Sequence, residues 1–265
     1  MSAAVVAAPD SPLVLNKERM PFNTDAGIGL RANLGLLVLR SDQTIEDEFR
    51  FALPDDGVAL YGARLYNDVE ITPEKLARMY GEIPATVGLL PDVAFDVIGF
   101  ACTSGALVIG EDKIAARVRE ALPEVKVTDP VTAARAALTA LGAARVALLT
   151  PYIGTINHSL RNSLMARGMD IPVMGSFNEP DDNTVARISA ESLERAILDI
   201  GAAKECDAVF VACTSLRVAR SVERVEGKLG KPVTSSNHAL AWHMLRLAGV
   251  ADEVAGKGAL FRRGL

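Results

Sequence analysis

The feature that most constrains the fold of this chain is an internal repeat. Residues 96–104 (DVIGFACTS) are answered by residues 207–215 (DAVFVACTS), at an offset of 111 residues. The same offset aligns residues 34–41 (LGLLVLRS) with residues 145–152 (RVALLTPY). Because two separate pairs of segments share one register, the repeat predicts two similar halves built on the same strand-loop unit.

Within each half, short apolar runs alternate with amphipathic stretches. The apolar runs are too short for helices and are bounded by turn-forming residues, which predicts strands at 34–39, 58–63, 97–101, 125–128, 146–150, 173–177, 209–212 and 232–234. The amphipathic stretches predict helices at 72–80, 112–122, 131–141, 156–167, 190–203, 216–228 and 239–247. This alternation is typical of α/β folds with parallel sheets flanked by helices.

We therefore expect two α/β lobes related by a pseudo-twofold repeat. The expected organisation is an N-terminal arm (1–32), a first lobe (33–135), a second lobe (136–240), and a C-terminal helix and tail (241–265) that pack back on the lobes. Ligands of open parallel sheets bind beyond the carboxyl ends of the strands. The active site is therefore expected in the cleft between the lobes.

The composition excludes several classes of partner. The chain has 265 residues, and its formal net charge of −5 disfavours nucleic acid and anionic membranes. No basic region precedes the short Ala/Val run at the N-terminus, and no apolar stretch approaches the roughly 20 residues that span a bilayer. We expect a cytoplasmic protein that acts on a small molecule.

Two of the three cysteines, Cys102 and Cys213, occupy matched positions directly after repeated strands. A helix is expected after each, and the N–H groups at a helix N-terminus lower the pKa of a thiol. Buried cysteines are commonly structural, as we interpret Cys206 to be, but duplication at matched positions favours function. The hydroxyl groups that follow add donors at the same place: Thr103, Ser104, Thr214 and Ser215.

No sequence pattern indicates a metal or an organic cofactor. His238 and His243 are five residues apart and do not share a helix face, and no Cys/His spacing is typical of a zinc site. Neither a phosphate-binding loop nor a dinucleotide fingerprint is present. His158 could lie near the site, but a surface or packing role is the simpler interpretation.

Several segments together resemble the aspartate/glutamate racemase superfamily, in the branch of maleate cis-trans isomerases and arylmalonate decarboxylases. They are the two ACTS segments, LLTPY at 148–152, DNTVARI at 182–188 and PVTSSN at 232–237. RSDQTIEDEF at 40–49 is most similar to the racemase-like proteins of ectoine-utilisation clusters. The resemblance covers about residues 34–247 and implies a cofactor-independent isomerase that forms a homo-oligomer.

The resemblance also implies roles for individual residues. Cys102 and Cys213 match the two catalytic cysteines of racemases and maleate isomerases. Arylmalonate decarboxylases keep only the second, so the presence of both speaks against decarboxylation. The matches to positions that contact substrate are Thr103, Ser104, Tyr152 and Asn183.

Asp42 departs from the family pattern, because the segment that it resembles in maleate isomerases has asparagine at this position. A carboxylate in place of an amide donor disfavours a second substrate carboxylate and favours a substrate amine. We therefore expect Asp42 to bind a cationic or N–H-bearing group. The alternative is that Asp42 turns away and caps the helix that begins near Thr44.

Three functions follow as hypotheses. The first is a racemase or epimerase of a small nitrogen-bearing carboxylate, in ectoine or amino-acid catabolism, with one cysteine removing a proton from carbon and the other returning one to the opposite face. The second is maleate cis-trans isomerisation, in which a cysteine adds to the alkene. The third is a ligand-binding regulatory protein on a racemase scaffold, which the paired thiols disfavour.

Overall fold

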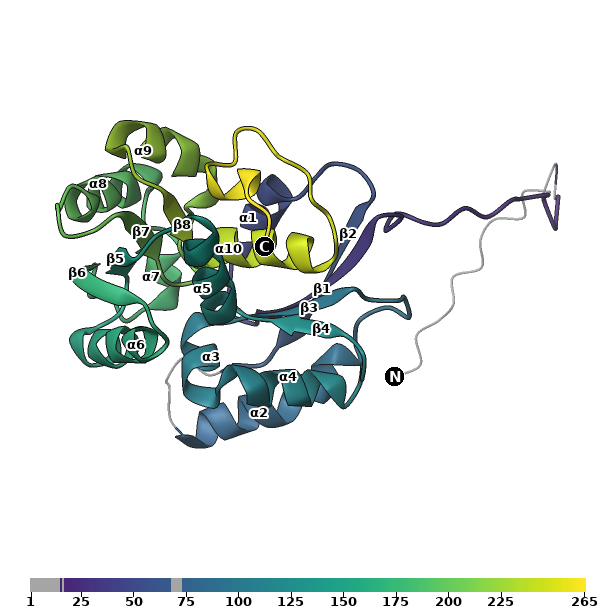
Figure 1. The fold of residues 1–265 in the computed structure, drawn as a ribbon. Helices are drawn as coiled ribbons and strands as arrows, with labels where there is room; N and C mark the ends of the chain where they lie inside the picture. Colours follow the sequence, from purple (N-terminus) through teal and green to yellow (C-terminus); the bar gives the residue numbers. More distant parts are fainter. Residues whose placement is uncertain (1–14, 16, 68–72) are drawn as a thin grey trace.

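The strand-helix alternation forms two four-stranded parallel sheets (Figure 1). The structure is a computed structural model that describes residues 15, 17–67 and 73–265. The strands are β1 (Ala32–Leu39), β2 (Val58–Leu65), β3 (Val97–Ala101), β4 (Lys126–Thr128), β5 (Arg145–Thr150), β6 (Asp170–Ser176), β7 (Ala208–Val211) and β8 (Val233–Ser235). The orders β2-β1-β3-β4 and β6-β5-β7-β8 are equivalent. The predicted fold class of two similar parallel-sheet lobes is confirmed.

Helices cover both faces of each sheet. Those following the strands of the first sheet are α1 (Ile45–Ala52), α2 (Pro73–Val87), α3 (Thr103–Ile109), α4 (Glu111–Arg119) and α5 (Pro130–Ala140). The rest are α6 (Gly154–Ala166), α7 (Asp182–Val185), α8 (Ala190–Gly201), α9 (Val222–Leu229) and α10 (Ser236–Leu247), with 3-10 turns η1 (Ala219–Ser221) and η2 (Leu260–Arg262). In the described part of the chain, no helix has the length and apolar character needed to cross a membrane.

Adjacent residues of a strand serve different cores, as the two-residue period of a strand requires. In β1, Leu36 packs with helices α1, α5 and α10, whereas Leu37 faces a core that contains Phe100 of β3. That second core continues into the other lobe, where it includes Leu148 and Phe210. The two lobes therefore share this second core and pack against each other through it.

The helix α10 follows the last strand of the second sheet but packs on the first sheet. Its Leu240 and Trp242 are fully buried in the same cluster as Phe49 of α1 and Ala137 of α5. Because α10 starts at the end of β8, its first turn lies at the edge where the strands of the second sheet end. This connection ties the first lobe to the end of the second sheet.

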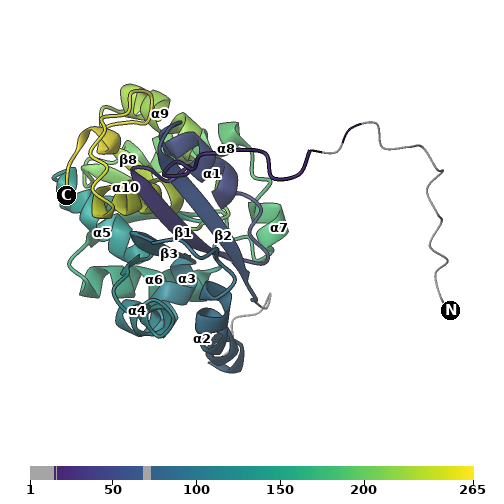
Figure 2. The same cartoon turned by 90° about the vertical axis from the view of Figure 1, so that its right-hand side faces the viewer.

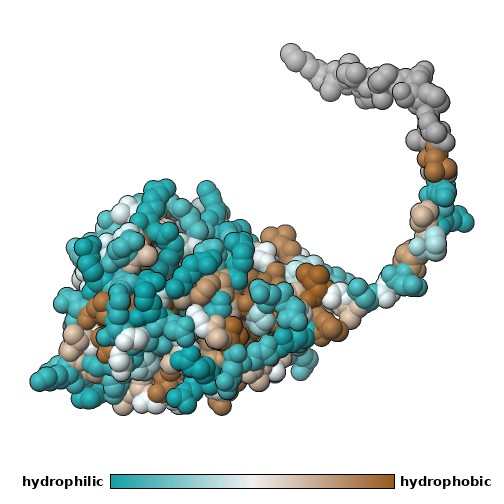
Figure 3. Space-filling model, turned by 90° about the horizontal axis from the view of Figure 1, so that it is seen from above, coloured by the Kyte–Doolittle hydropathy of each residue, from teal (hydrophilic) through white to brown (hydrophobic). Residues whose placement is uncertain are grey.

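The described residues before β1 form an extended arm. Figures 1 and 2 show its described part, residues 15 and 17–31, projecting away from both sheets. Figure 3 shows apolar groups along it, and Met20, Phe22, Ile28 and Leu30 are each at least 61% exposed.

Candidate active site

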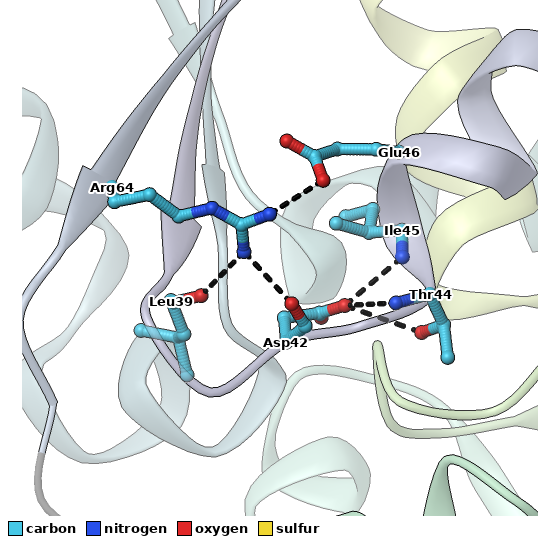
Figure 4. A network of polar contacts seen from close by, with 6 residues as sticks. All are labelled: Leu39, Asp42, Thr44, Ile45, Glu46 and Arg64. Carbon is cyan, nitrogen blue, oxygen red and sulfur yellow. Dashed lines mark hydrogen bonds and ion pairs between the residues drawn. The ribbon is translucent and has the colours of Figure 1, made fainter.

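The loop after β1 is built around Asp42 (Figure 4). The Asp42 Oδ1 atom accepts hydrogen bonds from the N–H groups of Thr44 at 2.8 Å and of Ile45, the first residue of α1, at 2.9 Å. The other oxygen, Oδ2, is buried and has no hydrogen-bond partner among the described residues. One oxygen therefore points to the start of α1, as in the alternative, and the second is unsatisfied.

Arg64 of β2 holds the same loop without reaching the carboxylate of Asp42 (Figure 4). Its guanidinium donates to the carbonyl oxygens of Leu39 at 3.0 Å and Asp42 at 2.8 Å, and it pairs with Glu46 at 2.5 Å. The positive charge of Arg64 is thus directed at two carbonyls and at Glu46.

Cys102 lies at the N-cap of α3, as the sequence predicts. Its sulfur accepts a hydrogen bond from the Gly105 N–H at 3.2 Å and lies 3.6 Å from the Ser104 hydroxyl. A Cβ at Gly105 would stand only 3.0 Å from this sulfur, so glycine permits the close approach. Burial nevertheless raises the pKa of Cys102 to about 11, and the charges of Asp182 and Asp42 act in the same direction.

Cys213 follows β7 in a conformation that is rare for a residue with a side chain, with φ of 133°. Its N–H donates to the Ser236 hydroxyl at 3.1 Å, and its sulfur accepts from the Ser215 N–H at 3.4 Å. Strained backbone of this kind occurs at functional sites, where the surrounding structure imposes it.

The prediction that a helix begins directly after Cys213 is wrong. The helix expected over 216–228 starts only at Val222, after the turn η1. The buried carboxylate of Glu48 in α1 accepts the N–H groups of Val218 and Ala219, each at 2.9 Å. These contacts from the other lobe satisfy the N–H groups of Val218 and of Ala219, which is the first residue of η1.

The pKa of the Cys213 thiol is raised further than that of Cys102. Burial raises the pKa of Cys213 to about 12, and the negative charge of Asp182 contributes, whereas hydrogen bonds from Ser215 and the Tyr152 hydroxyl lower it. The expectation that these sites lower the thiol pKa is therefore wrong, because desolvation outweighs the local donors. Both thiols are neutral at pH 7.

Tyr152 follows β5 and lies beside Cys213. Its hydroxyl is hydrogen-bonded to the Cys213 thiol, and the pKa of Tyr152 is raised well above its usual value by burial and then by the charges of Cys213 and Cys102. The hydroxyl is therefore protonated. It can donate to a thiolate or to a substrate oxygen.

Ser236, which the sequence analysis did not single out, joins the two cysteine loops. Its hydroxyl lies 2.8 Å from that of Thr103 and accepts the N–H of Cys213 at 3.1 Å. Ser236 begins α10, at the same sheet edge as Cys213. The sequence feature that could have identified Ser236 as a site residue is its position in the PVTSSN segment, at the end of a predicted strand.

Thr214 is fixed through its backbone. Its carbonyl oxygen accepts from the Thr44 hydroxyl at 2.6 Å and from Asn237 Nδ2 at 2.8 Å. The carbonyl can only accept, which fixes the orientation of the Asn237 amide. Asn237 Oδ1 is buried and, among the described residues, has no hydrogen-bond partner.

The short helix α7 brings a carboxylate to the site that the sequence analysis did not propose. Gln43 donates to Asn183 Oδ1 at 2.6 Å, so α7 lies against the loop that carries Asp42. The neighbouring Asp182 is half-buried, and its pKa is raised by burial and then by the charge of Asp42. Asp182 therefore precedes the residue that contacts the Asp42 loop, and its negative charge acts on both thiols.

The histidines lie apart from this arrangement. His158 is exposed on α6. His238 is hydrogen-bonded to Thr234 and to the carbonyl of Lys257, and burial lowers its pKa to about 4. His243 is hydrogen-bonded to Thr128. Among residues 15, 17–67 and 73–265, no group of three or more His, Cys, Asp or Glu is placed to hold a metal ion.

The site thus combines two neutral thiols, one from each lobe, with hydroxyl donors and two carboxylates. A thiol that loses its proton can act as a base toward carbon or as a nucleophile toward an alkene. The hydroxyl and N–H groups beside the thiols can stabilise negative charge on a substrate oxygen.

Comparison with known proteins agrees with this chemistry. The model of the arylmalonate decarboxylase family matches residues 111–261. The maleate isomerase of Nocardia farcinica is 28% identical over 246 residues, which cover 89% of this chain and 97% of that protein. The arylmalonate decarboxylase of Bordetella bronchiseptica is 29% identical over 217 residues, covering 76% of this chain and 89% of that protein.

A solved structure shows the same fold with chemistry captured on a cysteine. It is a cysteine-to-serine mutant of the Nocardia farcinica maleate cis-trans isomerase with a covalently bound succinylcysteine intermediate. The similarity has a TM-score of 0.78 at 27% identity and covers 87% of this chain and 98% of that one.

Proposed function

The chain belongs to the arylmalonate decarboxylase family, and we propose that it is a cofactor-independent isomerase of small carboxylates that works through Cys102 and Cys213. The observation that carries the proposal is the pair of buried thiols at equivalent positions of the two lobes, whose loops are joined by the Ser236 hydroxyl. A pocket that only binds a ligand does not need two thiols. Relatives named as maleate isomerases support the isomerase class.

The reaction that we propose is racemisation or epimerisation of a carboxylate that carries nitrogen at the reacting carbon. One cysteine, as thiolate, removes the proton from that carbon, and the other, as thiol, donates a proton to the opposite face. The enediolate formed between these steps is stabilised by the hydroxyl groups of Ser104, Ser215 and Tyr152. After one turnover the protonation states of the two cysteines are exchanged.

The resting thiols must first be converted to a thiol and a thiolate. Because both are neutral at pH 7, one proton is released to solvent before or during substrate binding. A positive charge on the substrate would favour this ionisation, because it offsets the carboxylates that raise the thiol pKa values. The unsatisfied oxygen of Asp42 supports a substrate with N–H groups.

The similarity of the 40–49 segment to proteins of ectoine-utilisation clusters suggests a wider setting for the enzyme. We extend the proposal to ectoine or amino-acid catabolism in the cytoplasm, with the enzyme acting as a homo-oligomer. Asn183, Thr103 and Thr214 remain proposed substrate contacts.

Maleate cis-trans isomerisation is the second candidate, favoured by the names of the relatives. In that reaction a cysteine thiolate adds to one alkene carbon and the electron pair moves to the carboxylate conjugated with the other. Rotation about the resulting single bond and expulsion of the thiolate give the trans product. Asp42 and Asp182 oppose this candidate, because they would lie near a substrate dianion.

Deuterium exchange in D2O tests the two candidates together. Wild-type protein is incubated with single enantiomers of α-amino and cyclic amidine carboxylates and, separately, with maleate. Deuterium at the reacting carbon with loss of optical purity supports racemisation, whereas fumarate formed from maleate supports the second candidate. Exchange or isomerisation of none of these compounds would overturn the proposed enzymatic function for this substrate range.

Three alanine variants then test the thiol pair. Cys102→Ala and Cys213→Ala should each reduce racemisation by about 10³-fold, since each removes a positioned acid or base. The matched control is Cys206→Ala, because Cys206 is equally buried but its sulfur contacts the carbonyl oxygens of Ala203 and Gly201 away from the site. Full turnover by either site variant would overturn the two-thiol mechanism.

A further inference from the structure

The carboxylates of Asp42 and Asp182 approach the thiol site from different lobes. Asp42 is only 5% exposed, and the Gln43–Asn183 hydrogen bond of 2.6 Å joins the residues that follow each of them. The Thr44 hydroxyl lies 3.2 Å from Asp42 Oδ1 and donates to the carbonyl oxygen of Thr214, the residue after Cys213, at 2.6 Å. The Asp42 loop therefore lies against the loop that carries Cys213. In agreement with this placement, the negative charges of both aspartates act on Cys102, and that of Asp182 acts on Cys213 as well.

Neither carboxylate is neutralised by the protein. Within the described residues, neither Asp42 nor Asp182 forms an ion pair, and Arg64 is occupied by two carbonyls and Glu46. The charges that act most strongly on the two thiols are negative. Two uncompensated carboxylates at one partly buried site are unfavourable unless a cation binds between them or a proton is taken up.

The unsatisfied atoms near this pair show which kind of group is missing. The two buried side-chain atoms without hydrogen-bond partners in the described chain are Asp42 Oδ2 and Asn237 Oδ1, and both are acceptors. They lie in one connected network, because Thr44 contacts Asp42 Oδ1 and the Thr214 carbonyl to which Asn237 donates. Buried acceptors require donors, so the matching ligand group carries N–H or O–H.

We propose that Asp42 and Asp182 together form a subsite for the cationic nitrogen group of the substrate, an ammonium or amidinium next to the reacting carbon. This inference rests on the proposed function. It adds that the substrate carries a positive charge and names the residue that recognises this charge. Asp182 is the specificity-determining residue, since Asp42 already uses one oxygen to accept N–H groups at the start of α1.

The opposite arrangement is a proton held by Asp182. A protonated Asp182 would donate to a substrate carboxylate, and the site would then accept a dicarboxylate such as maleate. The two arrangements differ in the sign of their pH dependence. Cation binding strengthens as rising pH ionises Asp182, whereas dicarboxylate binding through a protonated aspartate strengthens as pH falls.

Calorimetric titration with isosteric pairs of probes tests the subsite directly. The pairs are racemic alanine against 2-methylpropanoate, and racemic tetrahydropyrimidine-4-carboxylate, a cyclic amidine, against cyclohexanecarboxylate. Racemic probes are used so that turnover does not change their composition. Wild-type protein should bind at least one nitrogen-bearing probe about 10-fold more tightly than its nitrogen-free partner, and this preference should grow as pH rises and ionises Asp182.

The Asp182→Asn variant should reduce that preference to about 2-fold and tighten maleate binding. Asp42→Asn, which keeps an oxygen to accept the N–H groups at the start of α1, should act in the same direction. The control is Asp181→Asn, because Asp181 is adjacent but exposed and caps α7 by accepting the Thr184 N–H, which asparagine can also do. It should leave the preference unchanged.

Equal binding of the nitrogen-bearing and nitrogen-free probes by the wild type would overturn the subsite. So would maleate binding that strengthens as pH falls and is lost in Asp182→Asn. The exchange experiment keeps this failure separate from failure of the proposed function. If the protein prefers the nitrogen-bearing probes but catalyses no exchange at carbon, the subsite is supported and the proposed reaction is refuted. If it catalyses exchange without this preference, the reaction is supported and the subsite is refuted.

Discussion

The buried carboxylate of Glu48 allows a sharp test of how the two lobes are joined. Glu48 is 2% exposed, and one of its oxygens, Oε2, accepts hydrogen bonds from the N–H groups of Val218 and Ala219 in the segment after Cys213. Burial raises the pKa of Glu48 to about 7 despite these two hydrogen bonds. Glu48→Gln keeps an oxygen that can accept both bonds and removes the buried charge.

The magnitude follows from proton linkage. A glutamate whose pKa rises from 4.5 in the unfolded chain to about 7 in the folded protein binds its proton more tightly when folded. Its contribution to stability is complete below pH 4.5 and is lost as pH rises through 7, by at most about 3 kcal/mol. The amide introduced by Glu48→Gln does not titrate, so the variant avoids this loss.

Urea denaturation at pH 5 and pH 8 measures the difference. The free energies of unfolding of wild type and Glu48→Gln should nearly coincide at pH 5, and the variant should be more stable by about 1–3 kcal/mol at pH 8. Glu46→Gln is the control, because Glu46 lies on the same helix but is half-exposed, and its pair with Arg64 is a surface contact. A stability difference that is the same at both pH values would refute the reasoning.

Three further predictions concern the thiols and their neighbours. Because the base must be deprotonated and the free thiols have pKa values of about 11 and 12, kcat/KM should rise about 10-fold per pH unit between pH 7 and 9; a plateau below pH 8 would contradict this. Tyr152→Phe removes a donor that lowers the pKa of Cys213, so kcat/KM at pH 8 should fall about 10-fold, as a pH–rate profile will show. Ser236→Ala leaves the buried Cys213 N–H without its acceptor and should lower the free energy of unfolding by about 1–3 kcal/mol in urea, whereas unchanged stability would mean that water replaces the hydroxyl.

The strands could be predicted because their signal is local. Each of the eight predicted strands overlaps an observed one, since short apolar runs bounded by turn residues reflect burial on both faces of a parallel sheet. The repeat of 111 residues also predicted that the two halves share one topology. Cys102 at the N-cap of α3 followed from the same local pattern, because the strand leads directly into that helix.

The second cysteine shows where local reasoning stopped. The two ACTS segments are identical, yet only the first begins a helix. The residues that follow differ, with Gly105 after the first segment and Leu216 after the second, and Glu48, which is 170 residues from Val218 in sequence, accepts the N–H groups of Val218 and Ala219. A contact at that separation leaves no trace in the pattern of either segment.

The amino-acid sequence by itself determined the α/β class, the division into two similar lobes and the matched positions of Cys102 and Cys213, because these features follow from local hydrophobic patterns and from an internal repeat. Only the tertiary structure decided the protonation state of those thiols and which residues surround them. Burial raises both thiol pKa values against the effect of local donors, Ser236 links the two loops, and the residue after Asp182 contacts the Asp42 loop from the other lobe. Desolvation and charge interactions depend on distances in space, and those exist only once the two lobes have packed on their shared core.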